Sequence, residues 1–272
     1  MQHSALINVM VAAARKAARA LKRDFGEVEN LQVSLKGPGN FVTAADRRAE
    51  ETLRAELAKA RPGYGFLGEE SGSHAGSDTT HTWIVDPLDG TTNFLHGIPQ
   101  FAISIGLERS GAIVAGVIYN PITDEMFVAE RGKGAFLNDR RLRVAARKRL
   151  ADSVIACGLP HLGRGDLELG LRELGAVQDK VAGLRRFGAA ALDLAFVAAG
   201  RIDGYWERNL SAWDMAAGII IVREAGGYVT DIDGNSDGMF TKRHIVAGNE
   251  TIQRALIASL KTAADQPVAS GG

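Results

Sequence analysis

Several residue types are scarce in this chain, and each shortage excludes a class of protein or site. Cys157 is the only cysteine among 272 residues, so no disulfide forms within the chain and no cysteine-based zinc site is available. Lys and Arg together number 32, and Asp and Glu also number 32, so no overall positive field holds nucleic acid or an anionic membrane. An anion site must therefore be local, built from backbone amides or a bound cation.

Long hydrophobic runs are also missing. No apolar stretch approaches the roughly 20 residues that a membrane-spanning helix needs. The first residues lack the cleavage site and unbroken apolar core of a secretory signal, and their Ala-rich pattern predicts an amphipathic helix instead. Together with the single cysteine, these features predict a cytoplasmic protein.

What is present is the composition of a globular protein, with 46% hydrophobic and 24% charged residues. Apolar spacing and turn residues predict helices and strands mixed along the whole chain. The predicted helices cover about 4–24, 43–60, 166–178, 189–199, 212–225 and 251–260. The predicted strands cover about 65–68, 82–86, 102–108, 113–119, 125–129, 153–157, 181–186 and 244–247, with a short extended or hairpin region near 31–36.

The order of these elements predicts a layered α/β fold. The strands from 102 to 129 are separated by turn residues and indicate an antiparallel meander. A regular strand–helix–strand rhythm is missing, which favours a layered α/β arrangement over a Rossmann sheet. We expect one compact unit over residues 1–261, made of two packed α/β halves at about 1–150 and 151–261. The small polar residues 262–272 predict a disordered tail.

The most informative string is Trp83-Ile-Val-Asp86-Pro-Leu-Asp89-Gly-Thr-Thr-Asn93. An apolar strand ends at Asp86, Pro87 stiffens the turn, and Asp89 follows three residues later. A helix starting after Gly90 would present backbone N–H groups beside both carboxylates, which places an anion site next to a cation site. The structural alternative is a simple turn in which Asp89 caps a helix.

Three further segments place acids where they are structurally unusual. Glu69 and Glu70 follow a predicted buried strand, although adjacent glutamates on a Gly-rich loop are commonly solvated. Asp214 and Asp46 each stand near the start of a predicted helix, where a capping box explains them equally well.

If these carboxylates converge in the fold, they limit the kind of ion that the site can bind and the reaction that it can catalyse. Glu69, Asp86, Asp89 and Asp214 cannot all stay ionised within a few Å of one another unless cations neutralise them. Oxygen ligands without His or Cys favour a hard ion, Mg²⁺ before Mn²⁺ or Ca²⁺. Two such ions about 3.5–4 Å apart activate a water and stabilise a leaving oxygen, which suits hydrolysis of a phosphate monoester.

The motifs resemble those of the inositol monophosphatase family, which belongs with the fructose-1,6-bisphosphatases in one superfamily. The matching strings are Gly68-Glu69-Glu70-Ser71, the Trp83–Asn93 string with Phe94, Trp213-Asp214-Met-Ala-Ala-Gly218 and Glu224-Ala-Gly-Gly227. The resemblance extends over about residues 5–260 and is closest to the bacterial inositol-1-monophosphatase branch. It implies an α/β/α/β/α sandwich of the sugar-phosphatase type, a homodimer, inhibition by Li⁺, and Mg²⁺-dependent hydrolysis of inositol 1-phosphate.

The resemblance also implies a metal-ligand set with two or three Mg²⁺ ions. Glu69, Asp86 and the carbonyl of Leu88 would hold the first ion. Asp86, Asp89 and Asp214 would hold the second, and a third, weaker ion would use Glu69.

The resemblance assigns the remaining site residues to water, phosphate and polyol. The water would be oriented by Glu70 and by Thr91, whose hydroxyl would bond to Asp46. The amides of Gly90 and Thr91 would bind phosphate. The polyol-side residues would be Asp89, Arg185, Gly188, Ala189, Ala190 and Glu207. Ala189 replaces a hydroxyl residue common in the family, and Lys36 is either a mobile-loop lysine near the metals or a solvated hairpin lysine.

Two alternatives remain open. The same chemistry can serve fructose 1,6-bisphosphate, a 3′-phosphonucleotide or histidinol phosphate. A different class is an RNA- or protein-binding regulator that uses the basic cluster at 140–149, which the plainer interpretation treats as a charged hairpin face. The six histidines show no metal-ligand spacing.

Overall fold

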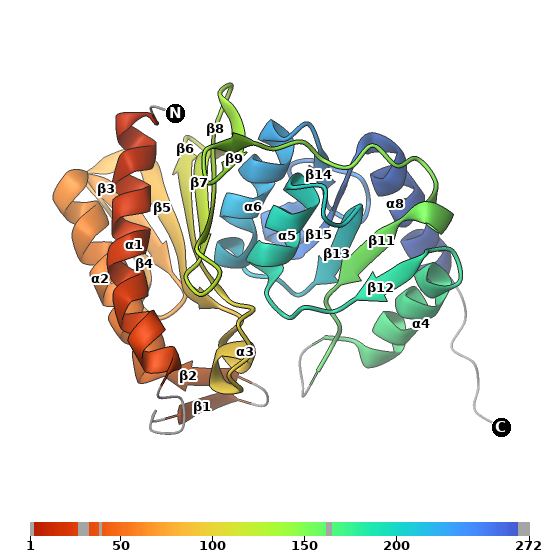
Figure 1. Ribbon diagram of the computed structural model, residues 1–272, viewed down its shortest axis with the longest axis horizontal. Coiled ribbons are helices and arrows are strands. Elements are labelled where there is room, and N and C mark those ends of the chain that lie inside the picture. The colour runs from red at the N-terminus through yellow and green to blue at the C-terminus, as the bar shows by residue number, and fades with distance from the viewer. Residues whose placement is uncertain (1–2, 27–32, 38–39, 162–164, 266–272) are drawn as a thin grey trace.

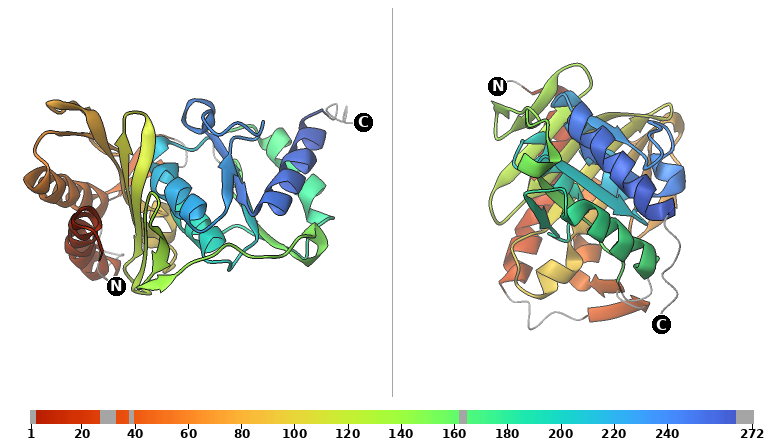
Figure 2. Two further views of the ribbon diagram at one scale, coloured as in Figure 1. Left: turned by 90° about the horizontal axis from the view of Figure 1, so that it is seen from above. Right: turned by 90° about the vertical axis from the view of Figure 1, so that its right-hand side faces the viewer.

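A computed structural model describes residues 3–26, 33–37, 40–161 and 165–265, with only the backbone described at 33–37, 40–43 and 265. The described residues form five layers (Figure 1, Figure 2). Helices α1 (Ala5–Phe25) and α2 (Ala44–Ala60) cover the outer face of a large sheet. Helices α5 (Ala190–Ala198) and α6 (Ala212–Glu224) lie between that sheet and a smaller one. Helices α4 (Leu167–Gln178) and α8 (Glu250–Asp265) cover the far side. This arrangement confirms the predicted α/β/α/β/α sandwich.

The large sheet has eight strands in the order β10-β9-β8-β7-β6-β5-β3-β4. The predicted meander is confirmed, because β6, β7 and β8 pair as antiparallel neighbours. The strands are β3 (Tyr64–Gly68), β4 (Gly72–His74), β5 (Asp78–Asp89), β6 (Ala102–Arg109), β7 (Ala112–Asn120), β8 (Glu125–Glu130), β9 (Gly134–Leu137) and β10 (Arg140–Arg141). A separate two-stranded hairpin is formed by β1 (Val33–Gly37) and β2 (Asn40–Thr43).

One pairing in the large sheet positions the acidic segments. Strands β3 and β5 run parallel, with Gly68 opposite Val85. Parallel neighbours end at the same edge of a sheet. Glu69, which follows β3, therefore lies beside the buried end of β5, where Asp86 and Asp89 stand. Short helix α3 (Thr91–Leu95) begins directly after that end.

The small sheet has five strands in the order β12-β11-β13-β15-β14. They are β11 (Val154–Cys157), β12 (Gly183–Arg185), β13 (Gly204–Arg208), β14 (Tyr228–Thr230) and β15 (His244–Gly248). Sequence patterns did not predict β13 and β14. Strand β14 has three residues and pairs antiparallel with β15, and β13 lies between β11 and β15, so both strands depend on neighbours that are distant in sequence.

The middle helices are apolar on all sides because each faces a sheet or another helix in every direction. Nearly every residue of α5 is buried, including Asp193. The main core cluster combines residues of both predicted halves, such as Ile118 of β7, Ala217 of α6 and Tyr205 of β13. The division into two packed halves of one unit stays a prediction.

The C-terminal helix corrects one boundary. Residues 262–265 belong to α8, whereas the sequence predicted a disordered tail from 262 onward. That prediction was wrong for these residues because Ala263 is fully buried and extends the apolar face of the helix. Residues 266–272 lie outside the described part. Among the described helices, none combines the length and apolarity needed to cross a membrane.

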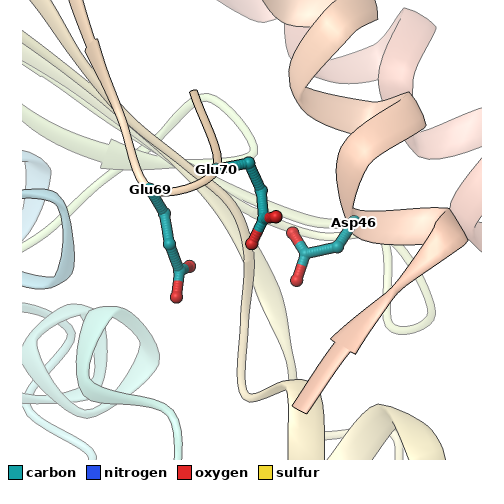
Figure 3. A group of neighbouring side chains, drawn as sticks. All are labelled: Asp46, Glu69 and Glu70. Atoms are coloured by element: carbon teal, nitrogen blue, oxygen red, sulfur yellow. The ribbon is translucent and has the colours of Figure 1, made fainter. Parts of the chain in front are cut away.

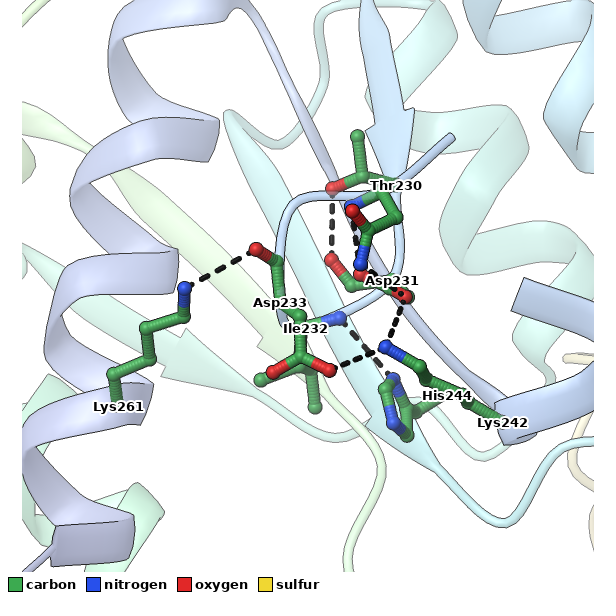
Figure 4. Close-up of polar contacts among 8 residues, drawn as sticks. Thr230, Asp231, Ile232, Asp233, Lys242, His244 and Lys261 are labelled. Carbon is green, nitrogen blue, oxygen red and sulfur yellow. Dashed lines mark hydrogen bonds and ion pairs between the residues drawn. The ribbon is translucent and has the colours of Figure 1, made fainter. Parts of the chain in front are cut away.

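A polar turn follows β14 and leads to short helix α7 (Met239–Lys242) (Figure 4). The Lys242 ammonium bridges the carboxylates of Asp231 and Asp233. The backbone N–H of Ile232 donates to Nδ1 of His244 at 3.1 Å. These bonds satisfy the buried Asp231 carboxylate and the Ile232 N–H at the edge of the small sheet, while Asp233 and Lys242 remain partly exposed.

Candidate active site

The end of β5 buries two aspartates and gives each a backbone partner. Asp86 is 2% exposed, and its Oδ1 accepts from the N–H of Leu88 at 2.9 Å across the proline turn. Asp89 is 9% exposed, and its Oδ2 accepts from the N–H of Ala191 at 2.7 Å. Asp89 therefore bonds to the first turn of α5, not α3, whose N-cap Gly90 makes no side-chain bond. This contact connects the end of β5 to the start of α5.

Asp214 lies at the third position of α6 and forms the predicted capping box with Ser211. Its Oδ2 accepts from the N–H of Ser211 at 2.6 Å. Asp214 also lines the same cavity as Asp86 and Asp89, so capping does not remove it from the site.

Three further acids, Asp46, Glu69 and Glu70, form a group of their own (Figure 3). Asp46 comes from α2, while Glu69 and Glu70 come from the turn after β3. One carboxylate oxygen from each of the three lies within 4.8 Å of the others. Metal ligands converge at such distances, so this part of the site fits a cation bound by oxygens.

Burial and mutual repulsion disfavour the charges of these acids. Burial, followed by the charge of Glu69, raises the pKa of Asp86 well above its usual range. Burial and Asp214 raise the pKa of Asp89 in the same way, and the bond from Ala191 opposes this only in part. Bound cations would relieve this repulsion, which supports the fit of divalent metal to this donor set.

The Thr91 hydroxyl stands between two acceptors. Its Oγ1 lies 3.0 Å from the carbonyl oxygen of Leu88 and 3.5 Å from Oδ2 of Asp46. A hydroxyl has one proton to donate, and the shorter contact is the better hydrogen bond. The predicted Thr91–Asp46 contact is therefore present but long, and the Leu88 carbonyl receives the better bond.

A cavity of about 310 Å³ opens over these groups. Its acidic side is formed by Glu69, Asp86, Asp89 and Asp214, next to Gly90 and Thr91. The remaining wall includes Gly188, Ala190, Glu207 and three basic side chains, His161, Arg186 and Arg208. Carboxylate oxygens, backbone at a helix start and a mixed polar pocket thus share one space.

The sequence matches the model of the inositol monophosphatase family over residues 2–265. The chain belongs to this family. It is therefore a phosphatase, and members of this family are metal-dependent, in keeping with the acidic group around Asp46, Glu69 and Glu70. The resemblance inferred from the motifs is confirmed.

Individual members of this family are similar in sequence to this chain over almost its whole length. The chain is 66% identical to a protein named inositol-1-monophosphatase from Mesorhizobium japonicum, over 96% of this chain and 98% of that one. It is 42% identical to a protein named Nus factor SuhB from Pseudomonas aeruginosa, over 94% and 96% of the two chains. The crystal structure of extragenic suppressor protein suhB from Bartonella henselae superposes with a TM-score of 0.92 at 64% identity, covering 95% and 99%.

Of the residues predicted for the polyol side of this phosphatase, some line the cavity and others do not. Gly188, Ala190 and Glu207 line the cavity. Ala189 is buried as the N-cap of α5, and Arg185 is exposed, with its Nη1 bonded to the carbonyl of Leu184 at 2.8 Å. Neither is among the residues that line the cavity. Lys36 belongs to β1, and its side chain lies outside the described part of the structure.

Sequence reasoning missed Arg186, which lines this cavity, and Tyr205, which bonds to the cavity residue Glu207. Arg186 lines the cavity in place of its neighbour Arg185, and the strand–loop boundary that separates the two was predicted one residue too late. Tyr205 donates a hydrogen bond to Glu207 from the same face of β13. Their two-residue spacing is the signal for a shared face of a strand, but β13 itself was not predicted.

The basic cluster at 140–149 is partly neutralised. Arg147 pairs with Asp203 at 3.1 Å, and Arg149 pairs with Asp152 at 2.7 Å. Arg140 and Arg141 are exposed in β10. A partner surface at this cluster stays a prediction.

Proposed function

We propose that the protein is a Mg²⁺-dependent phosphatase that hydrolyses inositol 1-phosphate to inositol and phosphate. The observation that carries the proposal is the meeting of Glu69, Asp86, Asp89 and Asp214 in one cavity beside Gly90 and Thr91, with Asp46 and Glu70 grouped next to Glu69. The name of the Mesorhizobium japonicum relative supports the choice of substrate.

The donor set favours two or three Mg²⁺ ions. The proposed ligands are Glu69, Asp86, the carbonyl of Leu88, Asp89 and Asp214. When bound, the metal supplies positive charge that activates water and stabilises the phosphate oxygens and the leaving oxygen. The oxygen-only ligands fit this hard ion better than a softer metal.

The protein's own groups orient the reactants. We assign Glu70 and Thr91 to the attacking water, with Asp46 beside them. The amides of Gly90 and Thr91 hold the phosphate at the start of α3. On the polyol side the proposed contacts are Asp89, Gly188, Ala189, Ala190, Glu207 and Arg185. Tyr205 supports this side because its hydroxyl bonds to the Glu207 carboxylate and fixes its orientation.

Three properties of the working enzyme complete the proposal. The family resemblance supports a homodimer and sensitivity to Li⁺. The single cysteine, which is buried and unpaired, is consistent with a cytoplasmic location.

A phosphate-release panel tests the substrate. It compares inositol 1-phosphate with fructose 1,6-bisphosphate, a 3′-phosphonucleotide and histidinol phosphate at varied Mg²⁺, with and without Li⁺. We expect the highest kcat/KM for inositol 1-phosphate, no turnover in chelator, and inhibition by Li⁺. A clear preference for another ester would replace the proposed substrate while leaving the metal chemistry intact.

A regulatory role is the second candidate, and the name of the Pseudomonas aeruginosa relative, Nus factor SuhB, supports it. The exposed Arg140 and Arg141, with Arg143 nearby in sequence, supply the surface. Neutralising the three arginines should abolish salt-sensitive RNA binding and leave phosphate release unchanged. Absence of RNA binding by the unaltered protein at low salt would remove this candidate.

A further inference from the structure

Glu50 is a buried carboxylate that the proposed mechanism does not use. It lies on α2 and is 3% exposed. Its Oε2 accepts from the backbone N–H of Glu70 at 2.8 Å, and its Oε1 accepts from the N–H of Ser71 at 2.7 Å. Both of its oxygens are therefore bonded to the turn that carries Glu69 and Glu70.

The turn is held on its other side by the sheet. The N–H of Glu69 donates to the carbonyl of Val85 in β5 at 3.3 Å. Three consecutive N–H groups, at 69, 70 and 71, thus have partners on two different elements. Because a backbone with all its donors satisfied in different directions cannot rotate freely, the turn presents Glu69 and Glu70 in a fixed orientation.

The packing around the turn leaves no room for a side chain at residue 68. A Cβ atom added at Gly68 would lie 2.4 Å from Oε2 of Glu50 and 2.7 Å from the ring of Phe66. The glycine at the end of β3 therefore allows the Glu50 carboxylate to approach the backbone. Carboxylate and turn fit each other only while residue 68 has no side chain.

The same helix face supplies a member of the acidic group. Asp46 precedes Glu50 by four residues, so the two side chains project from one face of α2, one turn apart. Asp46 joins Glu69 and Glu70 in the acidic group shown in Figure 3. Helix α2 therefore contributes one carboxylate to the acidic group directly and fixes the backbone that carries the other two.

We propose that Glu50 is a positioning residue that fixes the 69–71 turn and thereby sets the metal affinity of the site. The inference rests on the proposed function, because it takes Glu69 as a metal ligand. Glutamine is the sharpest replacement. It has the same length but only one acceptor oxygen, so its amide NH₂ must face one of the two N–H donors.

The test compares Glu50→Gln with Glu51→Gln, a control at an exposed neighbouring position of α2. Mg²⁺ binding is measured by titration calorimetry, and melting is followed in chelator and in Mg²⁺. We expect Glu50→Gln to weaken Mg²⁺ binding by about 10–100-fold, as loss of a group supporting a ligand does. The Mg²⁺ concentration for half-maximal activity should rise in parallel, with KM for the ester at saturating Mg²⁺ nearly unchanged. Glu51→Gln should behave as the unaltered protein.

A purely structural role gives a different result. Glu50→Gln would then melt lower by the same amount in chelator and in Mg²⁺, and its Mg²⁺ affinity would stay within about twofold of the unaltered value, well below the range in which ligand support acts. That outcome overturns the inference. If Glu50→Gln does not fold, Glu50→Asp gives the same test, because the shorter side chain keeps the charge but withdraws its oxygens from the N–H groups of Glu70 and Ser71. Failure of the unaltered protein to bind Mg²⁺ would instead contradict the proposed function.

Discussion

Replacing Asp89 with asparagine should raise the stability of the metal-free protein while abolishing its phosphatase activity. The amide oxygen of asparagine can still accept the 2.7 Å bond from Ala191, so the packing between β5 and α5 is retained. The change removes one negative charge from a site where Asp214, Glu207 and Glu69 all disfavour ionisation of Asp89. The metal-free variant is therefore expected to be more stable than the unaltered protein.

The size of the gain follows from charge separation. Two like charges about 5 Å apart, at an effective dielectric constant of about 20, repel by about 3 kcal/mol. Because burial and the neighbouring acids raise the pKa of Asp89, proton uptake would relieve part of this repulsion in the metal-free unaltered protein. We therefore expect a gain of about 1–2 kcal/mol, or roughly 2–4 °C in Tm for each kcal/mol.

Magnesium should make the unaltered protein more stable than Asp89→Asn, the reverse of the order expected without metal. At a free concentration about 100 times Kd, the unaltered protein gains about 2.7 kcal/mol from binding. Asp89→Asn loses a proposed ligand of the second ion and should gain far less, with phosphate release abolished.

Paired melting curves in chelator and in Mg²⁺, with Glu51→Gln as the charge-neutralising control, measure both states. A variant that melts below the unaltered protein in chelator would refute the electrostatic reasoning. Near-normal Mg²⁺-dependent phosphate release by Asp89→Asn would falsify the proposed metal site.

Three further predictions concern single residues. Gly90→Ala should destabilise the protein by about 1–3 kcal/mol in urea unfolding, because Gly90 has φ +92° and its added methyl would lie 2.8 Å from a carbonyl oxygen; an unchanged midpoint would contradict this. Burial lowers the pKa of His244, so its contribution to stability is complete above the unfolded pKa of about 6.5 and is lost as pH falls below it. His244→Asn keeps an acceptor for the N–H of Ile232 and should reduce the loss of stability as pH falls below about 6.5, whereas an identical pH profile would exclude His244 as its source. Burial raises the pKa of Cys157 to about 12, so thiol reagents should modify it slowly in the native state and rapidly in denaturant, and equal rates would show that the thiol is accessible.

The predicted residues that the structure brings into the cavity share a local signal. Asp86, Asp89 and Gly90 stand in one string, where an apolar strand, a proline turn and a helix start follow one another within a few positions. The capping box of Asp214 and the meander from β6 to β8 depend equally on neighbours in the chain. In such segments the hydrophobic period and turn residues specify the backbone almost without reference to the rest of the fold.

Other features exist only because distant segments pack together. Asp89 bonds to Ala191, 102 positions away, and Glu50 bonds to the turn 20 positions ahead of it. Strand β13 forms between β11 and β15 and β14 forms against β15, and Arg186 lines the cavity while Arg185 does not. The hydrophobic pattern of the sequence does not predict these contacts, because they depend on which elements become neighbours after the layers assemble. The sequence alone therefore determined the layers and the chemical groups, and tertiary packing decided which of those groups meet.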